Sequence, residues 1–484
     1  MSTVLVVTLV GMAVIAAVGL LGRRRPSADL AQWSVGGRRF GSATMWFLQA
    51  GETFTTFTFL GVAGLAFTGG VAATYSIPYV PLAVIVLYFL GPRVWRLGRE
   101  HGYLTQADFY EQRFGSRALG TLVALLGVIF MLPYLQLQIT GLGLIVKLVT
   151  GDGASSTLGM VIGTSLTATF VLWAGIRGVA ATSYLKDVLM IVAVAVIIVV
   201  VPLHFTGGIG HAFTEIAHRH TQLLTVHTGP NDRVWWTTSM LASAIGAGFL
   251  TFPHSWPALL SARSERGLRR NWVFLPLYQI ALILPMTIGF VAVLALPPNT
   301  NANGVLLTLT GRALPGWATG FIAVAGAAAA MVPAAVMVLA MSTLIARNVV
   351  RSRSPRLQFL TNHGAVVAIL ALALVLALVR PNALTDLLLL TYSGLVQFAP
   401  GLVAGLARRP LLGRIPVLLG MVVGEAVVVW LTFAHVDVAH INAGIVGLGV
   451  NVVVAALVHV AERATGRSRH EQGGRRQPEP LPQR

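Results

Sequence analysis

Long apolar runs alternate with short polar connections along the whole chain. The runs cover residues 4–22, 42–68, 72–91, 118–149, 157–175, 179–202, 235–260, 272–296, 317–346, 363–379, 384–406, 415–434 and 441–461. Most of them reach the ~20 residues that a helix needs to cross ~30 Å of hydrocarbon. Because helices satisfy their own backbone polar groups in lipid, the pattern predicts an all-α integral membrane protein with about thirteen transmembrane helices.

Composition agrees with this prediction and excludes several classes of protein. Of 484 residues, 55% are hydrophobic and only 10% are charged, which is more apolar surface than one soluble core could bury. Cysteine is absent, so disulfides and thiolate metal sites are excluded. The histidines between His204 and His227 have no spacing typical of a closed metal site.

The distribution of basic residues predicts the orientation in the membrane. A net charge of +18 could indicate a nucleic-acid partner, but most of the 34 Lys and Arg residues fall in alternate connections. The positive-inside rule then places the N-terminus outside and the C-terminus in the cytoplasm, in a bacterial cytoplasmic membrane. The first run is followed by Arg23–Arg25 and preceded by no charge, so we expect an uncleaved helix. The expected partner of the chain is therefore the lipid bilayer and not nucleic acid.

Two of the apolar runs contain residues that interrupt helices. The second run places Gly51, Glu52 and several threonines near its middle, and the seventh contains Gly246, Gly248 and Pro253. Unwound backbone is tolerated at membrane depth only where it lines a cavity or is buried in protein. Close packing of the glycines and backbone hydrogen bonds of the threonines are the structural alternatives.

The spacing of the two interrupted runs predicts the organisation of the chain, because five helices separate their starts, as an inverted repeat of five plus five helices requires. The expected units are an N-terminal helix with its basic flank (1–36), a first repeat (37–204), an outside loop (205–234), a second repeat (235–406), two further helices (407–461) and a disordered cytoplasmic tail (462–484).

Several motifs in order resemble the sodium/solute symporter family. They are the second run itself, YLTQADFYEQRFGS from Tyr103, YLQLQITGLG from Tyr134, AGIRGVAATSYLKD from Ala174 and the G-x-G-x-x-x-x-P-H pattern from Gly246 to His254. The FPHS and IARNVVR segments look most like the monocarboxylate permease subgroup, which takes up small acids such as lactate and pyruvate, and alanine. The resemblance implies a LeuT-like inverted-repeat fold of the APC superfamily architecture, with alternating access.

The resemblance also implies where substrate would bind, namely between the second and seventh helices at the middle of the membrane. The residues that it assigns to the substrate pocket are Thr53, Thr55, Phe57, Tyr134, Gln136, Ile245 and Phe249. A small carboxylate would be met there by half-helix N-termini and threonine hydroxyls.

The cation site of the family is only partly matched. The resemblance implies carbonyl ligands from Gly51, Phe54 and Ala329, and two adjacent hydroxyls on the ninth helix. Those hydroxyl positions fall on Val332 and Pro333, which offer no oxygen ligand from a side chain. A sodium ion would therefore lose part of its coordination, and no other metal site is predicted.

A lysine within the sixth helix offers an alternative to sodium. The position where many sodium users of the family carry an acid matches Ser183, and Lys186 and Asp187 follow one turn later. We expect the ammonium of Lys186 to replace the ion and to release a proton during the cycle. The structural alternative is an ion pair with Asp187 near the inside end of the helix, with the lysine reaching toward water. Glu52, beside the first break, is a second candidate proton carrier, and its alternative is a capping role.

Three further features have structural interpretations. His254 is expected to hydrogen-bond backbone freed by Pro257, with contact to substrate as the alternative. Glu425 is expected to be structural. Asp108, Glu111 and Arg113 are expected to form an ion-pair network that gates or braces the inside face.

The function predicted from these features is symport of a small organic solute, a monocarboxylate or small amino acid. The coupling ion is sodium by the resemblance or a proton by Lys186, and no cofactor is expected. A solute sensor acting through a partner is the alternative, while a channel suits the broken helices less well. We find no catalytic motif of an enzyme. The substrate and the oligomeric state stay open.

Overall fold

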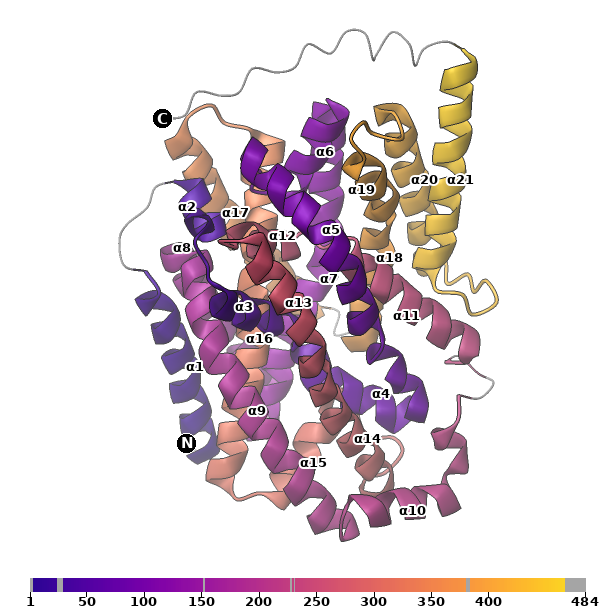
Figure 1. Cartoon of the computed structure of the whole chain (residues 1–484). Coiled ribbons are helices and arrows are strands. Elements are labelled where there is room, and N and C mark those ends of the chain that lie inside the picture. Colours follow the sequence, from indigo (N-terminus) through magenta and orange to yellow (C-terminus); the bar gives the residue numbers. More distant parts are fainter. Residues whose placement is uncertain are drawn as a thin grey trace.

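The computed structural model describes residues 3–23, 29–150, 153–226, 229, 231–379 and 384–465, and the predicted tail beyond Thr465 lies outside them. The described residues are helical apart from turns and one isolated bridge between Phe40 and Ala262. Helices stand side by side as one bundle (Figure 1). The all-α prediction is therefore confirmed.

The helices of the first half, with their short 3-10 and π turns, are α1 (Thr3–Leu21), α2 (Leu30–Val35), η1 (Gly36–Arg38), α3 (Ser42–Thr53), η2 (Phe57–Gly61), α4 (Val62–Gly69), η3 (Gly70–Ser76), α5 (Tyr79–His101), α6 (Gln106–Phe114), α7 (Arg117–Thr150), α8 (Gly153–Ala174), α9 (Ile176–Thr206), α10 (Ile209–Arg219) and η4 (Thr221–Leu224). Those of the second half are α11 (Arg233–Gly248), α12 (Ser255–Ser261), α13 (Glu265–Gln279), η5 (Ile280–Leu282), α14 (Ile283–Ala295), η6 (Ala302–Gly304), α15 (Val305–Ala313), α16 (Gly316–Leu344), η7 (Ile345–Val350), α17 (Pro355–Val379), α18 (Leu384–Leu395), η8 (Val396–Phe398), α19 (Ala399–Leu406), α20 (Arg414–Phe433) and α21 (Ala443–Ala464).

Eleven helical segments of the described residues are long and apolar enough to cross a membrane. The predicted count of about thirteen is higher because the second and seventh runs do not form unbroken helices. The second run is split into α3 and the pair η2 and α4, and the seventh into α11 and α12. The later part of the second run is joined with α5 in one segment, Phe57–His101, and neither α11 nor α12 alone is long enough to cross, which together account for the difference.

The centre of the bundle is α16, in which every residue from Ile322 to Leu344 is buried. Its middle reads GAAAAMVPAAV from Gly326, and such small side chains let neighbouring backbones approach closely. Helices α1, α7 and α9 pack against it. In contrast, α21 buries only four residues, and its exposed face carries Leu457 and Val460. The core therefore lies along α16, and the last helices are peripheral.

The connections sort into two sets at opposite ends of the bundle. Figure 1 shows α6, α12 and α19 at one end and α10 and α15 at the other, with the start of α1 at the second of these ends and the end of α21 at the first. This matches the alternation predicted from the basic residues. The assignment of the α6 end to the cytoplasm stays a prediction.

Candidate solute and cation site

The first helix break lies at Phe54 and Thr55. Phe54 ends α3 in an extended conformation, with φ −91° and ψ 94°, and the helix resumes as η2 and α4. Gly51, where the sequence predicted the break, is still inside α3. A Cβ at Gly51 would lie 3.0 Å from the Ser183 hydroxyl of α9. The glycine therefore permits close approach of α9 to the break and does not form the break itself.

The second break spans residues 249 to 254, between α11 and α12. Gly246 and Gly248 belong to the last turn of α11, and Pro253 lies within the unwound stretch. Leu250 has a φ of 52°, a conformation that side-chain-bearing residues rarely adopt. The predicted glycines therefore lie just before the break, and the chain turns at Leu250.

Side chains from neighbouring helices satisfy the backbone groups that the breaks expose. Gln138 of α7 accepts a hydrogen bond from the Thr56 backbone N–H at 3.2 Å. Gln106 of α6 donates to the carbonyls of Leu250 and Thr251 at 2.9 and 3.0 Å. Buried backbone groups without partners would be costly in a membrane. The fold therefore stabilises both breaks through specific hydrogen bonds from neighbouring helices.

Lys186 of α9 binds the carbonyl oxygens of the first break. Its Nζ atom donates to the carbonyls of Gly51 at 3.0 Å and Phe54 at 2.9 Å, and pairs with Asp187 Oδ1 at 2.8 Å. The side chains of Lys186 and Asp187 are fully buried. The ion pair of the structural alternative is therefore present, but the lysine does not reach toward water as that alternative also requires. The ammonium thus binds two of the three carbonyls that the resemblance assigns to a cation.

Ser183 and Ala329, which were also assigned to the cation site, do not bind the Lys186 ammonium. The Ser183 hydroxyl donates to the Val179 carbonyl of its own helix, and Ala329 of α16 is not among the hydrogen-bond partners of Nζ. Tyr278 of α13 donates to Asp187 Oδ1 at 3.1 Å. Asp187 therefore links the ammonium to a helix that the sequence reasoning did not connect with this site.

A cavity of about 100 Å³ lies between the two breaks. Its polar side chains come from α3, namely Gln49, Glu52 and Thr53, and from the second break and the start of α12, namely His254 and Ser255. A cavity needs roughly 10–15 Å³ of this kind to hold one water, so a small solute fits such a volume. The position between paired broken helices is where the resemblance places substrate.

Aromatic rings form much of the remaining wall. They belong to Tyr79 of α5, Tyr134 of α7, Phe252 of the second break, Trp272 of α13 and Tyr392 of α18. The rings of Phe252 and Tyr392 meet edge to face at 4.7 Å between centroids. The cavity is therefore enclosed by rigid, amphipathic side chains, as small-molecule sites commonly are.

Two of the predicted substrate residues, Thr53 and Tyr134, line this cavity. The other five do not. Thr55 and Phe57 are buried beyond the first break, and the Gln136 amide donates toward the Leu376 carbonyl of α17. Ile245 and Phe249 are partly exposed but are not part of the wall. The helix break falls at Phe54, three residues after Gly51. Gln49 and Glu52 of α3 therefore line the cavity, and Thr55 and Phe57 do not.

His254 differs from its predicted role. Its Nδ1 atom has no hydrogen-bond partner among the described residues, and it is buried. The ring packs against Tyr134 and Phe252 and lines the cavity. It therefore does not satisfy backbone freed by Pro257. The FPHS motif was the sequence signal that could have placed it in the site, whereas Tyr79, Trp272 and Tyr392 carry no motif.

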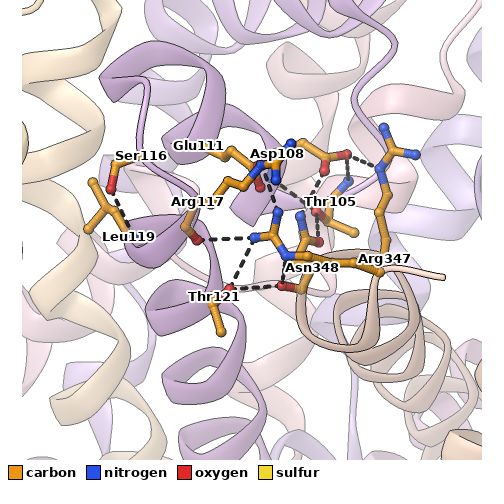
Figure 2. A network of polar contacts seen from close by, with 10 residues as sticks. Thr105, Asp108, Glu111, Ser116, Arg117, Leu119, Thr121, Arg347 and Asn348 are labelled. Carbon is orange, nitrogen blue, oxygen red and sulfur yellow. Dashed lines mark hydrogen bonds and ion pairs between the residues drawn. The ribbon is translucent and has the colours of Figure 1, made fainter. Parts of the chain in front are cut away.

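A network of polar contacts joins α6 to η7 at the α6 end of the bundle (Figure 2). Arg347 and Asn348 bind the two carboxylate oxygens of Asp108 at 2.6 and 2.9 Å, and Arg351 pairs with Glu111 at 2.8 Å. Arg113, which was expected in the same network, instead donates to backbone carbonyls at the end of α19. The network connects the predicted first repeat to the helix that follows α16.

A smaller bridge lies at the opposite end. Asp232 caps the start of α11 by accepting from the Trp235 N–H, and it accepts from His440 Nδ1 at 2.9 Å. His440 Nε2 lies 3.2 Å from Asp437. The bond to Asp232 raises the pKa of His440, and the bonds from Trp235 and His440 lower the pKa of Asp232. The connection between α20 and α21 is thus tied to the broken helix.

Comparison with known proteins identifies the class. Residues 33–407 match the family described as Sodium:solute symporter family. The chain therefore belongs to the sodium:solute symporter family, as the motifs predicted. Its members are transporters, so the expectation that the chain is not an enzyme is confirmed.

Three relatives and one solved structure indicate how far the likeness extends. The uncharacterized symporters YhjB and YodF of Bacillus subtilis are 33% and 32% identical, over 92% and 94% of this chain and 94% and 93% of theirs. A monocarboxylate transport permease protein of Rhizobium johnstonii is 30% identical over 79% of each chain. The substrate-bound structure of a Na⁺-coupled sialic acid symporter superposes with a TM-score of 0.80 at 16% identity, covering 95% of this chain and 98% of that one. The predicted LeuT-like fold is confirmed by this superposition.

Proposed function

We propose that the protein is a proton-coupled symporter that imports a small organic solute, a monocarboxylate or a small amino acid. The observation that carries the proposal is the position of Lys186, whose ammonium binds the carbonyls of Gly51 and Phe54. These are two of the carbonyls that the resemblance assigns to sodium. A covalently attached cation therefore takes the place of a diffusible one.

Electrostatics supports a proton as the coupling ion. The two carbonyl oxygens and Asp187 surround Nζ in a fully buried site, so a sodium ion would have to displace the ammonium against like charge. The ninth-helix positions Val332 and Pro333 offer no hydroxyl to compensate. Loss of a proton from Lys186 removes the charge from the break and leaves the carbonyls without a cation, which changes how strongly α9 holds α3.

The substrate class rests on a relative and on the cavity. The Rhizobium relative, 30% identical, is a monocarboxylate transport permease. The cavity between the breaks suits a solute of this size and adjoins Glu52 and Thr53, one and two residues beyond the Gly51 carbonyl that Lys186 binds. Binding of solute and the protonation state of Lys186 therefore act on the same short segment of α3, which is what symport requires.

Uptake into proteoliposomes tests the proposal. Labelled pyruvate, lactate, alanine and acetate are offered with a sodium gradient and a proton gradient imposed separately. We expect at least one solute to accumulate with the proton gradient in sodium-free buffer. Accumulation that strictly requires sodium would overturn the assignment of the coupling ion, whereas solute binding without any transport would favour a sensor.

Substitution of Lys186 gives a second test. In Lys186→Met we expect proton-driven accumulation to fall to passive equilibration, because the methionine side chain cannot bind and release a proton. Lys147, the only other lysine, lies exposed on α7, and Lys147→Met is the matched control that should transport normally. Undiminished accumulation by Lys186→Met would exclude the proposed role of this side chain.

A further inference from the structure

The cavity combines one carboxyl group with five aromatic rings. Glu52 contributes the carboxyl, and no Lys or Arg is among the described residues that line the wall. A pocket built only to hold an anion would be expected to present a cation or several free N–H groups. The single carboxyl group and the aromatic rings of this wall therefore favour recognition of a cationic group of the solute over an anionic one.

Glu52 has no partner within the described part of the protein. The residue is 8% exposed, its Oε1 atom is buried without a hydrogen bond, and no ion pair joins it to a basic side chain. The nearest candidate, the Lys186 ammonium, is already bound by two carbonyls and Asp187. A buried carboxylate without a partner is costly. A ligand with a positively charged group could supply the partner that Glu52 lacks.

The aromatic rings are arranged as a continuous wall beside this carboxyl. Tyr392 meets Tyr79 at 5.9 Å and Phe252 at 4.7 Å between ring centroids, and Phe252 in turn lies 6.5 Å from Tyr134. Ring faces attract a desolvated organic cation through their quadrupoles, and aromatic cages that contain an acid are a recurrent way to bind ammonium groups.

We propose that the cavity recognises its solute through an ammonium group, held by Glu52 and faced by the aromatic rings of Tyr79, Phe252 and Tyr392. The inference rests on the proposed function, because it names the chemistry of the solute carried by that same site. The substrate is then a small amine or amino acid, and a monocarboxylate without an amino group is not transported. A ring N–H of His254, whose Nδ1 is unpartnered, is available to the carboxylate of an amino acid.

Competition experiments with the purified full-length protein separate the chemical classes. Binding of L-alanine, ethylamine, lactate and propionate is followed by thermal shift and by inhibition of uptake in proteoliposomes. We expect alanine or ethylamine, or both, to bind, and lactate and propionate to have no effect at equal concentrations. Binding of ethylamine without alanine would assign a simple amine, and alanine alone would assign an amino acid.

Removal of the charge at Glu52 tests the residue directly. In Glu52→Gln we expect the affinity for the bound ammonium compound to fall about tenfold to a hundredfold, because an isosteric amide keeps the shape but not the charge. Tyr392→Leu should also weaken binding, while Tyr392→Phe retains it. Glu425→Gln is the matched control, because Glu425 is a buried acid of α20 that does not line the cavity.

One result would overturn the inference and leave the proposed function intact. It is accumulation of lactate or propionate but not of either amine, with Glu52→Gln retaining solute exchange and losing only proton-driven accumulation. Glu52 would then be a proton carrier beside a carboxylate. Conversely, ammonium binding that depends on Glu52 without transport under any gradient would sustain the inference while contradicting symport.

Discussion

Single side chains decide how the first helix break is stabilised. Lys186 and Gln138 satisfy its carbonyls and an N–H, and Gly51 leaves room for α9 to approach. The family resemblance implied the carbonyls of Gly51 and Phe54, and Lys186 was identified because a lysine within an apolar helix is rare and costly. Sequence reasoning could not identify Gln138, since a glutamine within a helix has no spacing that reveals a partner on another segment.

The close approach at Gly51 predicts the effect of one added methyl group. In Gly51→Ala the new Cβ would lie 3.0 Å from Ser183 Oγ, so α3 and α9 must separate and the bonds of Lys186 lengthen. We expect a loss of about 1–3 kcal/mol in stability and reduced transport. Thermal unfolding and uptake measure both.

Two comparisons make the cause specific. Gly364→Ala on α17 is the control, because a Cβ there meets open space. Ser183→Ala combined with Gly51→Ala removes the nearest atom and should restore part of the lost stability. Equal behaviour of the Gly51 and Gly364 variants would show that the packing at the break is looser than described.

At the scale of helices, periodicity and composition were sufficient to predict the bundle but not the position of the breaks. Runs of apolar residues marked the spans, and glycine and proline marked the two that are broken. The breaks themselves fall a few residues later, at Phe54 and at Leu250, because partners on α6, α7 and α9 capture the freed backbone there. The aromatic wall was missed for a related reason. Its rings come from five separate elements, and only the fold brings them together.

The network between α6 and η7 predicts a change in access to the cavity. Glu111→Gln removes the ion pair with Arg351, whose partners are each about a quarter exposed, so its loss should favour opening at this end. Because the chain has no cysteine, Ser255→Cys on the cavity wall reports access through its rate of maleimide labelling. We expect a rise of up to about fivefold, since a partly exposed pair is worth about 0–1 kcal/mol.

Glu215→Gln is the matched control for this experiment. It removes the ion pair with Arg219, which lies within α10 alone and joins no two helices. An identical labelling rate in the Glu111 and Glu215 variants would mean that the network braces α6 without controlling access.

At the scale of the whole molecule, the last two helices are attached to the second predicted repeat. His440, in the connection after α20, binds Asp232 at the start of α11, and Gln397 of η8 donates to the Gly444 carbonyl of α21. The boundaries predicted for the repeats, 37–204 and 235–406, remain predictions. The attachments indicate that α20 and α21 do not move independently of the broken helix α11.

The bridge at His440 predicts a dependence of stability on pH. The pKa of His440 is raised above its ordinary 6.5 by the bond to Asp232, so its contribution is fully present below pH 6.5 and is lost as pH rises through the higher folded-state value. We therefore expect the unfolding temperature to fall over that window, and His440→Gln to flatten the profile. His459→Gln on α21, which has no ion pair among the described residues, should leave it unchanged, and a flat wild-type profile would contradict the assignment.

A cation that is part of the polypeptide has a thermodynamic consequence for the cell. Under the proposed coupling, Lys186 never leaves the protein, so this site exchanges at most one proton for each solute. One charge crossing about 100 mV yields about 2.3 kcal/mol, and one pH unit yields about 1.4 kcal/mol. The sum supports a gradient of roughly 500-fold for a solute without net charge. The stoichiometry, and with it the steepest gradient that the cell can maintain, is then set by a single side chain and does not vary with external salt.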